Sequence, residues 1–214
     1  PGTTSIATRH LVALLDAAGQ PPEDLLAQAG VPRAQLDSPD LSFPLDGFRE
    51  LWARAAALQP DIGLAMIERF PPGQMHMLAH LALRSPTVRA ALVDLRKHAR
   101  VTSAADRVSF VERGDGTVQL QYDSAAIPWL AEHYLSMGVV LLTRATGRAL
   151  PLRRVEFVAA SGTASADAYL RRFGLAPHFG AAHNALVFDA AALDWPLLTQ
   201  DAYLHAILER VAEA

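Results

Sequence analysis

The sequence contains no cysteine in its 214 residues. This absence excludes disulfide bonds, thiolate nucleophiles, iron–sulfur clusters and cysteine-type zinc sites. Any bound metal would have to take histidine and carboxylate ligands. A chain without cysteine suits a reducing compartment, so we expect a cytoplasmic location.

Excess positive charge and long hydrophobic runs are also missing. The chain has 19 Lys and Arg against 22 Asp and Glu, a net charge of −3. This balance offers no broad cationic face for phosphates, so we do not expect this chain itself to bind nucleic acid. The longest apolar run, residues 135–142, contains Ser136 and is less than half of the ~20 residues that span a bilayer. We therefore expect no membrane partner, and the N-terminus shows no signal-peptide pattern.

The common catalytic signatures are absent. The sequence has no Gly-rich phosphate loop, no G-x-S-x-G elbow and no H-E-x-x-H zinc motif. A triad of Ser136, His133 and Asp123 would lack an oxyanion loop beside a helical Ser/His pair. We expect no catalytic activity and no cofactor.

What the chain does have is a large apolar fraction, 51% of its residues, arranged at helical spacing through the first hundred positions. Residues 45–56 show this spacing most clearly, with the amphipathic face of a surface helix. Ser85 as N-cap and Pro86 at the first position predict the start of another helix. The pattern predicts an all-helical region over residues 6–100.

After residue 100 the pattern changes. Residues 108–112 and 118–122 alternate with period two around Gly114-Asp115-Gly116, which predicts a β-hairpin. Residues 128–146 are apolar nearly all round, which predicts a central buried helix. Further strands are expected at 155–157 and 185–188, and further helices at 167–173 and 198–214. The expected fold class is α+β: a helical N-terminal half packed on an α+β half with antiparallel strand pairs.

Eight histidines stand out, several of them in apolar segments. On a helix, the four-residue spacing of His76 and His80 puts both imidazoles on one face, as in paired metal ligands. Without a third ligand at a matching offset, a role in a pocket or in the core is the stronger interpretation. His98 lies at the edge of the next helix's apolar stripe, where it can close such a site or extend toward solvent.

Trp129, His133 and Tyr134 share the apolar segment 128–146. Aromatic residues with polar tips in an apolar wall suit a pocket for a small organic ligand, although each one taken singly is more often a core residue. We assign as candidate ligand-binding residues His76, His80, His98, Trp129, His133 and Tyr134. We assign no catalytic and no metal-binding residue.

Six segments follow one another in a recognisable order: 25–31 (LLAQAGV), 81–92 (LALRSPTVRAAL), 152–157 (LRRVEF), 169–174 (YLRRFG), 179–188 (FGAAHNALVF) and 194–197 (DWPL). In this order and spacing they resemble the N-terminal effector-binding, arabinose-binding-like domain of AraC-type transcriptional regulators. The resemblance is to the branch whose sensor domain begins with helices rather than a cupin barrel. It covers about residues 6–198.

The resemblance implies that residues 1–198 form an effector-binding sensor domain, helical over 6–100 and α+β over 101–198. Residues 199–214 would form a linker helix toward a C-terminal helix-turn-helix domain that this chain does not contain. It also implies a small organic effector and a homodimer that binds DNA through that further domain. From the residues we expect this effector to be apolar or carboxylate-bearing, because an arginine of the pairs 153–154 or 171–172 that reached the pocket would favour a carboxylate ligand. His76, Ala79 and His80 depart from the small and aromatic residues usual there, which suggests a pocket adapted to one ligand.

Two other functions remain open from the sequence. The first is a His-rich metal or haem-binding sensor, or a metalloenzyme domain, and a transition metal bound at unit stoichiometry would favour it. The second is a dimerisation module whose pocket is filled by its own side chains. A structure without a cavity near Trp129 would favour the second.

Overall fold

The computed structural model describes residues 2–3, 6–38, 41–71, 75–101, 106–123 and 127–213. Up to residue 101 the described elements are helices, as the sequence predicts, and a short two-stranded ribbon that the sequence does not predict. The α-helices are α1 (Ala7–Ala17), α2 (Glu23–Ala29), α3 (Leu45–Leu58), α4 (Ile62–Ala65), α5 (Met77–Leu83) and α6 (Val88–His98). The 3-10 turns are η1 (Arg33–Gln35), η2 (Met66–Arg69) and η3 (Ala99–Val101), and the ribbon pairs β1 (Gly2–Thr3) with β2 (Phe43–Pro44).

The described residues from 106 onward form a five-stranded sheet and three α-helices. Its elements are β3 (Arg107–Glu112), β4 (Thr117–Asp123), α7 (Pro128–Thr146), β5 (Leu152–Phe157), α8 (Ala166–Phe173), β6 (His178–Phe179), β7 (Ala185–Asp189), η4 (Ala190–Asp194) and α9 (Ala202–Glu213). The strand order is β3-β4-β7-β5-β6, and every neighbouring pair except β5 and β6 is antiparallel. The predicted hairpin and the α+β class are confirmed.

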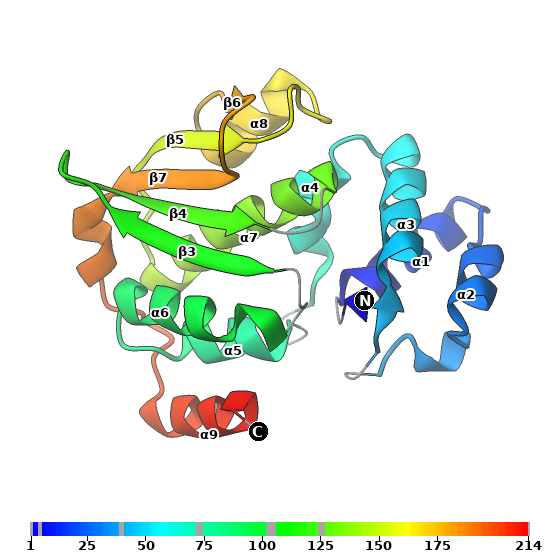
Figure 1. The fold of residues 1–214 in the computed structure, drawn as a ribbon, viewed down its shortest axis with the longest axis horizontal. Helices are drawn as coiled ribbons and strands as arrows, with labels where there is room; N and C mark the ends of the chain where they lie inside the picture. The colour runs from blue at the N-terminus through cyan, green and yellow to red at the C-terminus, as the bar shows by residue number, and fades with distance from the viewer. Residues whose placement is uncertain are drawn as a thin grey trace.

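Among the residues that the structure describes, the buried apolar side chains form two clusters. In one, α1, α2 and α3 pack together around Trp52, Phe43 and Phe48. In the other, α6, α7 and α8 pack with strands β4, β5 and β7. Helix α7 reaches both clusters, since its first turn joins the helical one, which confirms the predicted central helix. Figure 1 shows α1–α3 gathered to one side of the sheet.

The boundary between the two clusters lies earlier in the chain than the change from helices to strands near residue 101. Helices α5 and α6 lie beside the sheet and α7, apart from α1–α3 (Figure 1). The apolar stripe of α6 is visible in the sequence, but its partner, the β3–β4 hairpin, lies later in the chain. The N-cap of α6 also differs from expectation: Thr87 Oγ1 accepts from Ala90 N at 3.3 Å, whereas Ser85 Oγ donates to Asp94 Oδ2 at 2.5 Å.

Helix α7 is held at both ends and along its length. It begins with Pro128 at its first position and ends at Gly147, whose φ of 67° is the left-handed conformation that glycine adopts readily. Ser136 Oγ donates to the Leu64 carbonyl of α4 at 2.8 Å. Gly63 allows this approach, because a Cβ there would lie 2.8 Å from the Trp129 carbonyl oxygen.

The C-terminal helix begins later than the sequence suggests, at Ala202 rather than Leu198, and Asp201 Oδ1 accepts from Leu204 N at its start. The preceding segment forms three hydrogen bonds with the C-terminal ends of α5 and α7: Leu198 N donates to Ala145 O at 2.6 Å, Thr199 Oγ1 to Leu83 O at 2.5 Å and Asp201 N to Arg84 O at 3.1 Å. Helix α9 lies on the outside of α5 and α6 (Figure 1), with none of its residues buried. No helix in the described ranges is long and apolar enough to cross a membrane.

Candidate functional site

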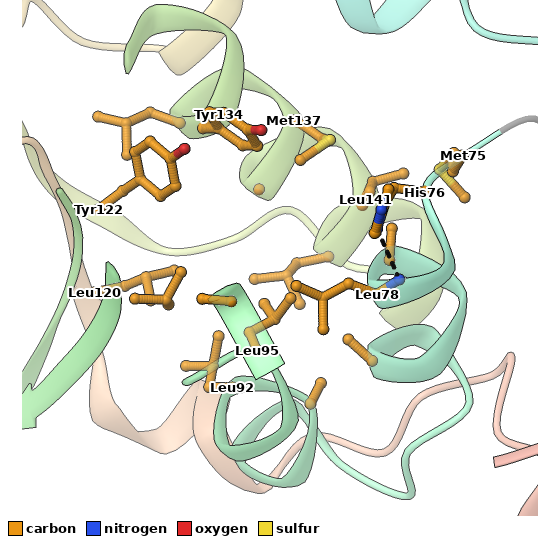
Figure 2. A pocket seen from close by; sticks show the side chains of 18 of the residues that line it. Met75, His76, Leu78, Leu92, Leu95, Leu120, Tyr122, Tyr134, Met137 and Leu141 are labelled. Atoms are coloured by element: carbon orange, nitrogen blue, oxygen red, sulfur yellow. Dashed lines mark hydrogen bonds between the residues drawn. The ribbon is translucent and has the colours of Figure 1, made fainter. Parts of the chain in front are cut away.

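A cavity of about 140 Å³ lies between α5, α6, the β3–β4 hairpin and α7. Its wall is almost wholly apolar, and Figure 2 shows the side chains that converge on it. Most of the apolar lining comes from four elements: Leu78, Ala79, Ala82 and Leu83 of α5, Ala91, Leu92 and Leu95 of α6, Val108 and Leu120 of the hairpin, and Leu135, Met137, Leu141 and Leu142 of α7. A single-ring molecule fits an apolar space of about this size.

Helix α7 contributes a long part of the wall. His133, Met137 and Leu141 follow one another at intervals of four residues, so they lie on one face of this helix. Gly138 lies in the same wall. A Cβ at this position would meet only Leu186 Cδ1, at 3.5 Å, which is ordinary contact. The missing side chain therefore leaves space that a larger residue would take.

His76 stands at the edge of the cavity, outside the helix in which the sequence places it. It is the N-cap of α5, with an extended backbone (φ −59°, ψ 146°), and its Nδ1 accepts from Leu78 N at 3.2 Å (Figure 2). A neutral ring that accepts at Nδ1 carries its hydrogen on Nε2. Burial, and then the nearby His80, lower the pKa of His76, which favours this neutral form.

Two tyrosines form another part of the wall. The rings of Tyr122 and Tyr134 lie 4.2 Å apart between centroids, and both face the cavity in Figure 2. Burial raises the pKa of Tyr134, and the carboxylate of Asp106, itself a lining residue, raises it further. The Tyr134 hydroxyl therefore stays protonated at physiological pH.

His133 and Asp106 are the most deeply buried polar side chains of the wall, each 3% exposed. The ring of His133 packs against Trp52, Phe70 and Tyr134, with centroid distances of 5.9, 5.5 and 5.4 Å. Its Nδ1 has no hydrogen-bond partner among the described residues. Burial, reinforced by His10, lowers the pKa of His133 to about 3, so the imidazole is neutral.

Of the six residues singled out from the sequence, the structure places His76, His133 and Tyr134 in this wall and His80, His98 and Trp129 outside it. The helical spacing argument does not apply to His76 and His80, because His76 precedes the helix. Trp129 packs against the α1–α3 cluster, since α7 enters that cluster with its first turn. His98 faces α9 instead, near Glu209 and Glu213.

Sequence reasoning missed several lining residues, among them Phe70, Met75, Asp106 and Tyr122. The sequence did contain a signal for Tyr122, because Leu120 and Tyr122 are two residues apart in a predicted strand and therefore point to the same face. No local pattern marks the other three, which flank elements rather than lie within them. For metals, the described residues hold one cluster of three suitable side chains, and it is His98 with Glu209 and Glu213 rather than the pair of His76 and His80.

Comparison with known proteins gives a consistent set of matches. Residues 19–197 match the family model described as the arabinose-binding domain of AraC transcription regulators, N-terminal. Uncharacterized HTH-type transcriptional regulators of Mycobacterium bovis and Mycobacterium tuberculosis are each 30% identical over 210 residues, covering 91% of this chain and 60% of the regulator.

Among solved structures, the transcriptional regulator CdpR from Pseudomonas aeruginosa has a similar fold. Its TM-score is 0.60 at 17% identity, over 88% of this chain and 60% of that one. This likeness shows the fold alone. The chain thus spans about 60% of the length of each of these regulators.

Proposed function

The chain belongs to the family of N-terminal arabinose-binding domains of AraC transcription regulators, and from that membership we propose that it senses a small organic effector. The observation that carries the proposal is the cavity of about 140 Å³ between α5, α6, the β3–β4 hairpin and α7. Protein interiors are close-packed, and spaces larger than a water molecule are few. An apolar space of about this size suits a ligand such as one aromatic ring or a short aliphatic chain.

We infer that the effector is uncharged. Among the described lining residues there is no Lys or Arg, and the two lining histidines have lowered pKa values. The cavity does contain a buried carboxylate, Asp106. A carboxylate ligand would therefore be desolvated with no cation among the described lining residues to pair with. Arg153 and Arg172 form ion pairs elsewhere, with Asp189 and Glu68 respectively.

Neutral polar groups in the wall can orient such a ligand. The imidazole of His133 has one nitrogen without a partner among the described residues, and a neutral imidazole offers one donor and one acceptor. The Tyr134 hydroxyl is held protonated. An effector with a single hydroxyl or carbonyl group on an apolar body matches this wall best.

Effector binding would affect helix α9 through residues 198–201, the segment that precedes it. The carbonyls of Leu83, Arg84 and Ala145, at the ends of α5 and α7, hold the segment that leads into α9. These same helices line the cavity. An effector that binds one spacing of the helices better than another shifts the population of α9 positions, and in a regulator this would pass to the DNA-binding part.

Thermal unfolding in the presence of matched ligands tests the proposal. We expect an alcohol or phenol of single-ring size to raise the midpoint, and the carboxylate with the same carbon skeleton to raise it much less. A ligand present at 100 times its Kd adds about 2.7 kcal/mol to stability. If no uncharged molecule of this size raises the midpoint, the sensing proposal is wrong. If carboxylates raise it more, only the ligand class is wrong.

A cavity-filling variant locates the binding. Ala79→Phe places a ring into the cavity and should abolish the ligand-induced shift. Ala17→Phe adds the same ring at an exposed position of α1 and should leave the shift unchanged. A shift that survives Ala79→Phe would place the ligand elsewhere.

Two further parts of the proposal concern the whole regulator. We propose that it forms a homodimer and that it binds DNA through a helix-turn-helix domain outside this chain, as the family resemblance implies. Sedimentation of the chain at several concentrations tests the first. Binding of this chain to operator DNA without the rest of the regulator would contradict the second.

A further inference from the structure

The outer face of the domain brings a histidine and two glutamates together between α6 and α9. One possible ligand atom from each of His98, Glu209 and Glu213 lies within 4.8 Å of the other two. Glu209 and Glu213 are four residues apart on α9, so their carboxylates project from one face of this helix. His98 is the last residue of α6.

The histidine of this cluster is buried and unpaired, which is unusual for a purely structural contact. His98 is 5% exposed, and its Nε2 has no hydrogen-bond partner among the described residues. A buried polar group without a partner costs about 1–3 kcal/mol, and such groups are rare in folded proteins. An imidazole kept beside two carboxylates at this cost is prepared to bind a cation.

Lys97 shows that the carboxylates already attract positive charge. Its Nζ lies 3.0 Å from Glu209 Oε1 and 2.5 Å from Glu213 Oε1. The Lys97 side chain is 47% exposed, so the ammonium can turn away into solvent without leaving an unpaired buried charge. A dication that also gains the imidazole would replace it with stronger bonds.

We propose that His98, Glu209 and Glu213 form a site for a divalent transition-metal ion of the zinc type, which fastens α9 to α6. One imidazole and two carboxylates are ligands that Zn²⁺ prefers, and water would complete the tetrahedron. Mg²⁺ and Ca²⁺ prefer oxygen ligands alone and gain little from the histidine. The site lies apart from the cavity and does not depend on effector sensing.

Isothermal titration of the 214-residue chain with Zn²⁺ tests the site. We expect one ion per chain, and at least about tenfold weaker binding in His98→Ala and in Glu213→Gln. Glu213 is half-exposed, so its substitution does not threaten folding. His183→Ala, which removes a half-exposed histidine near Asp123, serves as the matched control and should bind Zn²⁺ as the wild type does. Equal Zn²⁺ affinity in His98→Ala, or no binding up to millimolar Zn²⁺, overturns the proposal.

Lys97→Met separates a metal site from a plain ion-pair network. If the ammonium and the metal compete for the same carboxylates, this variant should bind Zn²⁺ several-fold more tightly than the wild type. Hydrogen exchange supplies a second readout, since Zn²⁺ should slow amide exchange along α9, and Mg²⁺ at the same concentration should not. Weaker Zn²⁺ binding in Lys97→Met, or unchanged exchange in α9, would contradict the proposal.

Discussion

Replacing His133 by phenylalanine should remove a pH-dependent loss of stability that the wild-type domain shows in mild acid. Burial lowers the pKa of His133 from 6.5 to about 3 in the folded chain. Between these values the unfolded chain binds a proton that the folded chain does not, so stability is full above pH 6.5 and falls as the pH is lowered. Phenylalanine cannot titrate.

The magnitude follows from the two pKa values. At pH 5 the unfolded imidazole is mostly protonated and the buried one is still neutral, which costs the folded state about 2 kcal/mol relative to pH 8. Phenylalanine keeps a ring beside Trp52 and Phe70, so the variant should fold with a change of less than about 1.5 kcal/mol at pH 8.

Urea unfolding at pH 8 and pH 5 measures the effect. The wild type should lose about 2 kcal/mol more over this interval than His133→Phe does. His178→Phe, at an exposed histidine on β6, is the control and should behave as the wild type. Equal losses in the wild type and in His133→Phe would refute the assignment of a buried neutral imidazole.

Three other substitutions test the local packing and capping of α4, α6 and α7, each by urea unfolding. Gly63→Ala should destabilise by about 1–3 kcal/mol, because its Cβ would lie 2.6 Å from Glu132 Oε2 and 2.8 Å from the Trp129 carbonyl; unchanged stability would mean that α4 and α7 separate easily. Thr87→Ala should cost about 1 kcal/mol through the lost N-cap of α6, whereas Thr87→Ser, which keeps the hydroxyl, should cost less. Gly138→Ala should stabilise by about 0.5–1 kcal/mol, because its Cβ makes only ordinary contact; a loss of stability would show that α7 needs this glycine.

Local patterns were sufficient for the elements that carry their own boundary signals. Pro128 and the glycine at 147 mark both ends of α7, and the predicted range 128–146 is the observed one. The hairpin was predicted for the same reason, since period-two alternation surrounds Gly114-Asp115-Gly116. These signals act within a few residues and need no knowledge of the rest of the fold.

The candidate site was only partly within reach of the sequence, because a cavity is a property of the space between elements. His76 illustrates the limit: its spacing to His80 predicts a shared helix face, but the helix begins one residue later and the ring turns back to cap it. Trp129 lies on the predicted helix and still packs into another cluster. Which of two neighbouring cores a side chain enters depends on contacts with residues far away in the chain.

The hydrogen bonds at residues 198–201 attach the N-terminal end of α9 to the rest of the domain. The twelve residues of α9 form a helix about 18 Å long. The preceding residues 198–201 form hydrogen bonds with the ends of α5 and α7, which also line the cavity. No residue of α9 is buried, and polar pairs hold the helix to α6: Lys97 with Glu209 and Glu213, and Asp94 with His205. A small rotation at residues 198–201 would move the C-terminal end of α9 further than its first turn. A probe at that end would therefore register a change in the cavity most readily.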